Sequence, residues 1–265
     1  MISIRPVHRE DSVLTKYVSI KGRKIGCRLV IFDKDGTLTD FSKIWIPVTR
    51  KRIACIIEEI EGSRELGESI MKAWGVDPVT EAIDPRGPCV SAPHSEEALI
   101  AATVLYQNGY PWNEAKQVVE TALDRADSLR DYRRDLKPVM GMKETLERLK
   151  ERGLLLALAT CDARNQTEEI LRILGISNLF DVILSAEEVS HSKPHPEMVL
   201  TICERLEVPC SEAILVGDTE GDMAMGRRAG IALTVGVLEG GITPRAQMEE
   251  VADVVIDSLS EIRPL

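Results

Sequence analysis

The chain has 265 residues, enough for one large domain or for one domain with a second inserted into it. Apolar residues make up 44% of the sequence and charged residues 29%, a balance typical of globular proteins that argues against disorder and fibrous repeats. The 33 Lys and Arg residues against 43 Asp and Glu give a net charge of −10, which disfavours binding to nucleic acid or to an anionic membrane.

The first predicted elements are a hairpin and a buried strand. Residues 16–28 alternate apolar and polar side chains around a Lys21-Gly22 turn, which indicates a hairpin. Residues 29–32 are wholly apolar, which favours a strand buried on both faces and ending at Asp33. We expect residues 1–28 to form an N-terminal extension that adds a hairpin to the sheet or contacts another subunit.

The middle of the chain, residues 40–137, is expected to contain helices and no strand. The segment 84–95 has three prolines, which prevent a continuous helix and predict a loop. Apolar residues at helical spacing and capping residues predict helices over 47–60, 63–74, 95–106 and 113–132.

From residue 138 onward, apolar strand patterns alternate with helical ones. Strands are predicted at 154–160, 181–184, 213–217, 231–235 and 254–256, and helices at 142–152, 167–174, 196–206 and 222–229. This alternation is typical of a parallel sheet with helical crossovers. The sequence therefore predicts a doubly wound, Rossmann-like α/β core from residues 1–39 and 138–265, with an inserted all-helical cap domain over residues 40–137.

Polar side chains follow several of the predicted strands. Asp33 and Asp35 follow the first strand, Thr160 ends the next, and Lys193 and Asp218 come after later strands. Ligands of open α/β sheets bind at the carboxyl ends of the strands, so we expect these side chains to meet there. Carboxylates together with a hydroxyl and an ammonium group suit a site for Mg²⁺ and a phosphate.

Four segments, IFDKDGTLTD, LALAT, HSKPHPE and VGDTEGD, resemble in this order the four motifs of the haloacid dehalogenase superfamily. The insertion after the first motif resembles the helical cap of that superfamily. The resemblance implies that Asp33 is a nucleophile that becomes an aspartyl-phosphate, and that Asp35 is the general acid and then the general base. It implies that Thr160 and Lys193 bind the transferring phosphoryl group.

The same resemblance implies a Mg²⁺ site. Asp33, the backbone oxygen of Asp35, and Asp218 would hold the ion, and Asp222 would either ligate it or orient its water and Lys193. Asp35 disfavours a dehalogenase, because displacing a halide needs no proton for the leaving group.

The first motif with its cap looks most like those of phosphoglycolate-phosphatase-like members. We therefore predict Mg²⁺-dependent hydrolysis of a small phosphomonoester. Two alternatives stay open: a phosphomutase or phosphotransferase of the β-phosphoglucomutase type, in which a sugar hydroxyl replaces water, and a non-catalytic phosphate-binding protein.

Some cap residues are candidates for selecting the substrate. Arg86 and His94 lie in the proline-rich segment, where a lid would supply discriminating contacts. The basic run 49–52 could bind a carboxylate or second phosphate of the substrate, although such a run is more typical of a solvated helix face. Trp45 is expected to pack near the hinge.

Histidines and cysteines give weaker signals. His191 and His195 have the spacing of a zinc pair, but Pro194 and Pro196 favour two loop histidines. Six cysteines occur without a C-x-x-C pair, which fits a reducing cytoplasm, and no segment has the length and apolar character of a membrane span or signal peptide. The expected partner is a small phosphorylated metabolite, with no nucleic acid and no membrane, and the chain is expected to be a monomer or homodimer.

Overall fold

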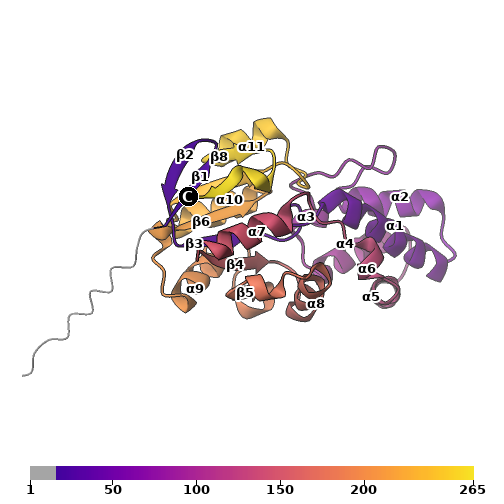
Figure 1. The fold of residues 1–265 in the computed structure, drawn as a ribbon. Helices are drawn as coiled ribbons and strands as arrows, with labels where there is room; N and C mark the ends of the chain where they lie inside the picture. Colours follow the sequence, from indigo (N-terminus) through magenta and orange to yellow (C-terminus); the bar gives the residue numbers. More distant parts are fainter. Residues whose placement is uncertain (1–15) are drawn as a thin grey trace, which may run out of the picture.

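A six-stranded parallel sheet forms the centre of the larger lobe in the computed structural model, which describes residues 16–265 (Figure 1). The chain reaches β4 and β5 on one side of β3 and then crosses to β6, β7 and β8 on the other, so the sheet is doubly wound as predicted. Its order is β5 (Val182–Ser185), β4 (Leu155–Thr160), β3 (Leu29–Phe32), β6 (Ala213–Gly217), β7 (Leu233–Val237) and β8 (Val254–Ile256).

Helices cover both faces of this sheet. Val30 and Phe32 of β3 point to the face covered by α7 (Met142–Glu151) and α8 (Arg164–Leu174). Leu29 and Ile31 point to the other face, covered by α9 (Glu197–Arg205) and α10 (Glu220–Ala229), with α11 (Arg245–Val251) beside α10. Burial on both faces explains why every residue of β3 is apolar.

A small antiparallel sheet joins the two ends of the described chain. The predicted hairpin is confirmed as β1 (Tyr17–Ile20) and β2 (Arg23–Gly26), and residues 1–15 of the predicted extension lie outside the described residues. β1 also pairs with β9 (Ile262–Pro264), where the sequence predicted only a turn. That prediction was wrong because β9 has three residues, too few for a periodic pattern, and forms by pairing with the distant β1.

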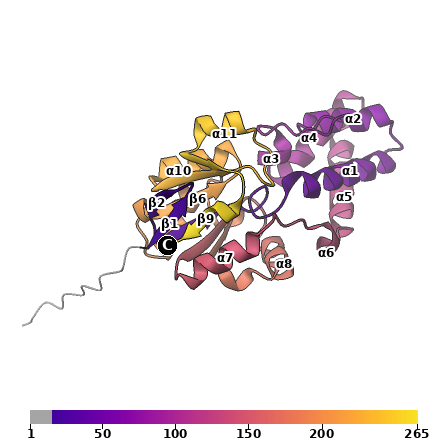
Figure 2. The same ribbon diagram turned by 45° about the horizontal axis from the view of Figure 1, so that its top comes forward.

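The cap forms a separate helical lobe beside the sheet (Figure 2). Helices α1 (Phe41–Glu59), α2 (Arg64–Ala73), α4 (His94–Gln107) and α5 (Trp112–Ser128) bury a core of their own, and the short α6 (Tyr132–Asp135) leads back to the sheet. The two linkers between the lobes lie side by side, since the Asp40 N–H donates to the Lys137 carbonyl at 2.7 Å. This arrangement supports the predicted insertion.

Two local predictions in the cap were wrong. Helix α1 begins at Phe41 rather than at Pro47, because the Asp40 side chain accepts a hydrogen bond from the Lys43 N–H and caps an earlier first turn. The segment predicted as a loop contains the short helix α3 (Pro88–Ser91). Pro88 occupies its first position, where no N–H is needed, so proline starts this helix instead of preventing it.

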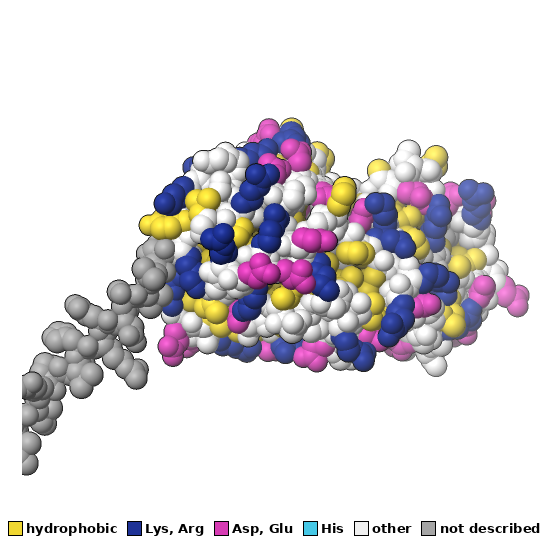
Figure 3. Space-filling model, in the orientation of Figure 1, with side chains coloured by type: hydrophobic (Ala, Val, Ile, Leu, Met, Phe, Trp, Pro, Cys, Tyr) yellow, Lys and Arg dark blue, Asp and Glu magenta, His cyan; other side chains and the backbone are white. Residues whose placement is uncertain are grey.

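The surface charges and the cysteines agree with what the sequence predicts. Lys and Arg side chains are interspersed with Asp and Glu on the face shown in Figure 3. All six cysteines are free. Among residues 16–265, no helix is both long and apolar enough to cross a bilayer.

Candidate active site

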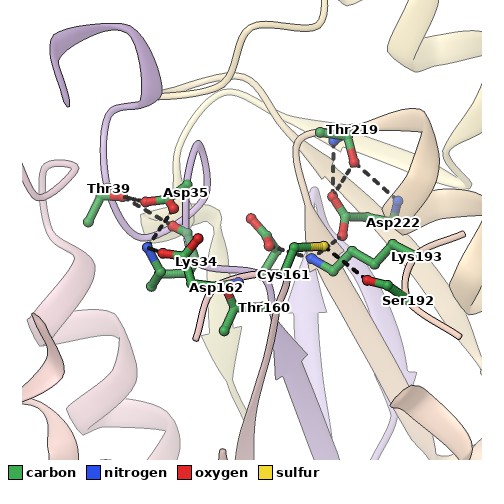
Figure 4. A network of polar contacts seen from close by, with 11 residues as sticks. Lys34, Asp35, Thr39, Thr160, Cys161, Asp162, Ser192, Lys193, Thr219 and Asp222 are labelled. Carbon is green, nitrogen blue, oxygen red and sulfur yellow. Dashed lines mark hydrogen bonds and ion pairs between the residues drawn. The ribbon is translucent and has the colours of Figure 1, made fainter. Parts of the chain in front are cut away.

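Three buried carboxylates meet at the carboxyl ends of β3 and β6. Asp33 follows β3, Asp218 follows β6, and Asp222 lies in the first turn of α10. One oxygen from each lies within 4.8 Å of one from each of the others. Thr219 caps α10 and donates its hydroxyl to Asp222 Oδ2 at 2.6 Å, which fixes that carboxylate (Figure 4). The structure thus brings together three of the predicted metal-binding residues.

A glycine makes this approach possible. Gly36 has a φ of +88°, and a Cβ added there would lie 2.1 Å from Asp218 Oδ2. Any other residue would meet both an unfavourable backbone conformation and the Asp218 carboxylate. The glycine of the first motif is therefore required by the packing of β3 against the end of β6.

Lys193 is the cation of this cluster. Its Nζ contacts Asp33 Oδ1 and lies 2.8 Å from Asp222 Oδ1. Burial raises the pKa of Asp33 to about 7, against the lowering effect of Lys193, and the neighbouring Asp222 charge raises it further. For Lys193, the attraction of Asp222 and Asp33 outweighs burial and holds its pKa well above the usual value, so the ammonium stays charged.

Asp218 gives the clearest indication that this site suits a cation. Neither carboxylate oxygen has a hydrogen-bond partner among residues 16–265. Burial, together with the charges of Asp33 and Asp222, raises the pKa of Asp218 well above its usual range, against the lowering effects of Lys193 and the Ile242 N–H. A hard divalent cation such as Mg²⁺ prefers oxygen ligands, and this donor set fits it. The part of the Asp35 backbone oxygen stays a prediction.

The second aspartate of the motif belongs to a different network. Asp35 accepts from Lys34 Nζ at 2.5 Å and from the Thr39 hydroxyl at 2.9 Å, and Lys34 Nζ also lies 2.9 Å from Asp162 Oδ2 (Figure 4). Burial raises the pKa of Asp35, but the Lys34 charge and these hydrogen bonds outweigh it and lower the pKa. Sequence reasoning did not identify Lys34, whose side chain is only 2% exposed.

Thr160 lies at the end of β4, as predicted. It is 3% exposed, and its hydroxyl accepts a hydrogen bond from the Asp162 N–H at 3.2 Å. Thr160, Asp33 and Lys193 line one cavity of about 680 Å³ between core and cap. The next residue, Cys161, lines the same cavity, and its Sγ lies 3.2 Å from the Ser192 hydroxyl.

The cap supplies the rest of the cavity wall. Arg52 is 5% exposed and lies between Glu97 and Asp127, so the interpretation of its basic run as a solvated face was wrong at this position. Burial raises the pKa of Glu97 to about 7, against the lowering effect of Arg52. Trp45, predicted to pack at the hinge, lines the cavity as well, and so does His94.

The other cap candidate, Arg86, does not line this cavity. Its Nη2 donates to Glu220 Oε1 at 2.7 Å, and Gln247 donates to the same oxygen at 2.5 Å. Arg86 therefore connects the cap to the first turn of α10, between the predicted metal-binding residues Asp218 and Asp222, and does not face the cavity.

His191 and His195 lie in a loop, as predicted, yet close together. Their ring centroids are 4.5 Å apart, and His191 Nδ1 lies 3.0 Å from Glu197 Oε2. Both imidazoles are exposed. Glu197 uses its carboxylate to accept from the backbone N–H groups of Ser190 and His191, which holds the loop that carries Lys193.

Comparisons with known proteins agree with this geometry. The family model of haloacid dehalogenase-like hydrolases matches residues 27–230. The probable phosphatase IndB of Dickeya dadantii is 30% identical, over 88% of this chain and 91% of its own, and hexitol phosphatase B of Escherichia coli K12 is 28% identical, over 88% and 92%. A β-phosphoglucomutase structure from Clostridium difficile shares the fold, with a TM-score of 0.58 and 21% identity over 89% and 92% of the two chains. The chain belongs to the haloacid dehalogenase-like hydrolase family.

Proposed function

We propose that the protein is a Mg²⁺-dependent phosphatase that hydrolyses a small phosphomonoester through an aspartyl-phosphate at Asp33. One observation carries the proposal: Asp218 is buried without a hydrogen-bond partner in the described chain, next to Asp33 and Asp222. That arrangement is costly without a cation and suited to a metal-assisted attack on phosphorus. The names of the relatives, which are phosphatases, support it.

In the first half-reaction, an Asp33 oxygen attacks phosphorus and the bond from phosphorus to the leaving alcohol breaks. Asp35 donates its proton to the leaving oxygen. The hydrogen bonds from Lys34 and Thr39 favour the ionised form of Asp35, but a phosphate dianion beside it raises its pKa again, because two like charges disfavour one another. Bound Mg²⁺ would supply neutralising charge at the phosphoryl oxygens.

In the second half-reaction, water attacks the phosphorus of the aspartyl-phosphate. Asp35, now ionised, takes a proton from this water, and the bond to Asp33 breaks to release inorganic phosphate. Lys193 and Thr160 hold the phosphoryl oxygens through both steps. Carboxylates Asp33, Asp218 and Asp222 would hold the metal.

The proposed partner is a small phosphorylated metabolite, bound while the cap excludes bulk water. Six free thiols fit a reducing compartment, so the cytoplasm is the proposed location. A monomer or a homodimer is the proposed assembly.

The test is release of inorganic phosphate from a panel of phosphomonoesters, with Mg²⁺ or with EDTA, by the wild type and by Asp33→Asn. We expect release that requires Mg²⁺ and is lost in the variant. Release by Asp33→Asn at the wild-type rate would refute the aspartyl-phosphate mechanism. Conversion of one sugar phosphate into its isomer without phosphate release would favour a phosphomutase, and binding of phosphate without turnover would favour a binding protein.

A further inference from the structure

The cap contributes a charged cluster of its own to the cavity. Arg52 donates from Nε to Asp127 Oδ1 at 3.1 Å, from Nη2 to Asp127 Oδ2 at 2.7 Å, and from Nη1 to Glu97 Oε2 at 2.8 Å. All three side chains line the same cavity as Asp33 and Lys193. One guanidinium is thus shared by two carboxylates. Because burial raises the pKa of Glu97 to about 7, the cluster carries a full excess negative charge only above neutral pH.

This cluster is a poor site for a second anionic group. Among the described residues, the cavity lining contains one arginine, Arg52, and one lysine, Lys193. Both are already paired with carboxylates. A carboxylate or second phosphate of a substrate would reach the remaining Arg52 N–H groups only beside Glu97 and Asp127. The ionised Asp127 carboxylate repels a like charge placed beside it.

Hydroxyl groups, in contrast, find both acceptors and donors on this wall. The Asp127 side chain is 31% exposed, and its carboxylate oxygens can accept further hydrogen bonds beyond those from Arg52. His94 Nε2 lies 3.4 Å from Asp127 Oδ2 and its side chain is 45% exposed. A hydroxyl can donate to Asp127 and accept from an Arg52 N–H that Glu97 and Asp127 leave free.

We infer that Arg52, Glu97 and Asp127 select phosphomonoesters whose end remote from phosphorus is an uncharged, hydroxyl-bearing carbon chain, and that they reject a carboxylate there. The inference rests on the proposed phosphatase function and names its substrate class. A cavity of about 680 Å³ also exceeds what a two-carbon acid fills. By this inference 2-phosphoglycolate, which the resemblance suggested, is a poor substrate.

A matched pair of six-carbon compounds tests the inference, because D-glucitol 6-phosphate and 6-phosphogluconate differ mainly at the terminal group, a neutral alcohol in one and a carboxylate in the other. We expect wild-type kcat/KM to be about 10- to 100-fold higher for D-glucitol 6-phosphate, the value of one hydrogen bond to a charged group. Asp127→Asn removes one negative charge and should lower kcat/KM for the polyol phosphate, raise it for the acid, and so narrow this ratio.

The ratio is the informative quantity, since a partly unfolded variant loses activity on both compounds equally. Asp124→Asn is the matched control, because Asp124 lies on the same helix, is exposed and does not line the cavity. It should leave the ratio at its wild-type value. An equal or higher wild-type kcat/KM for 6-phosphogluconate, or an unchanged ratio in Asp127→Asn, would overturn the inference.

Binding separates this inference from the proposed function. Calorimetric titration of Asp33→Asn with the same two compounds in Mg²⁺ should show tighter binding of D-glucitol 6-phosphate. If the wild type binds it preferentially without releasing phosphate, the phosphatase proposal fails and the inference stands. If the wild type releases phosphate from both compounds without preference, the phosphatase proposal stands and the inference fails.

Discussion

The Asp218 carboxylate should stabilise the protein only when a metal is bound, and Asp218→Asn tests this. Its oxygens lie within 4.8 Å of those of Asp33 and Asp222. At an effective dielectric constant of about 20, each ionised pair at that distance costs about 3.5 kcal/mol. Attraction to Lys193 and retention of a proton on Asp218 offset part of the cost, so we expect the metal-free variant to be about 2–4 kcal/mol more stable than the wild type at neutral pH.

The sign of the pH dependence follows from the raised pKa of Asp218. A carboxyl whose pKa is raised by folding contributes its full stability at low pH and loses it as the pH rises through the folded-state pKa. Asparagine does not titrate, so the advantage of the variant should grow with pH. Urea unfolding in EDTA across a range of pH measures it, with Asp124→Asn as an exposed control.

Addition of Mg²⁺ should reverse the order of stability. At a metal concentration about 1,000 times the dissociation constant, the wild type gains about 4.1 kcal/mol, which exceeds the expected advantage of the metal-free variant. The variant has lost a charged ligand and gains much less. The reasoning is refuted if Asp218→Asn is less stable than the wild type at every pH in EDTA, or if Mg²⁺ stabilises both proteins equally.

Three further predictions follow from the site. Asp35→Asn should slow both formation and hydrolysis of the phosphoenzyme by about 10²–10⁴-fold, which rapid-quench kinetics measures, and a change in one step alone would contradict the dual role. Gly36→Ala should lower the free energy of unfolding by more than Gly22→Ala, because Gly22 has a similar positive φ but nothing within 4 Å of an added Cβ. Urea unfolding compares the two variants, and equal losses would show that crowding against Asp218 has no effect. Because burial raises the pKa of Glu97 to about 7, the wild type should lose up to about 3 kcal/mol of stability as the pH rises from about 4.5 to 7. Glu97→Gln should reduce this dependence of stability on pH, and the control Glu96→Gln should not.

The candidate site residues were predictable because they follow strands whose apolar runs are easily recognised. Asp33, Thr160 and Asp218 each come at the end of a strand, and the parallel sheet brings these ends to one edge. Lys34 was not identified, because its burial depends on Asp162, which a different strand end supplies. No local pattern reports such a contact.

Arg52 was misinterpreted for a related reason. A basic run suggests a solvated helix face, but helices α4 and α5 cover Arg52 with Glu97 and Asp127. One signal was available: Arg52 lies four residues before Ile56, so the two side chains share the helix face that packs into the cap core. A charged residue on the apolar face of a helix is more often paired than solvated.

The pairing of Asp40 with Lys137 has a consequence for how this protein can change over evolutionary time. The cap leaves and re-enters the sheet at neighbouring points, so its ends are already as close as those of a tight turn. Replacing the whole cap by a lobe of another size would leave β3 and Asp33 in register. In the proposed function, the core carries the reaction and the cap selects the substrate, so the cap could be replaced while the reaction is retained.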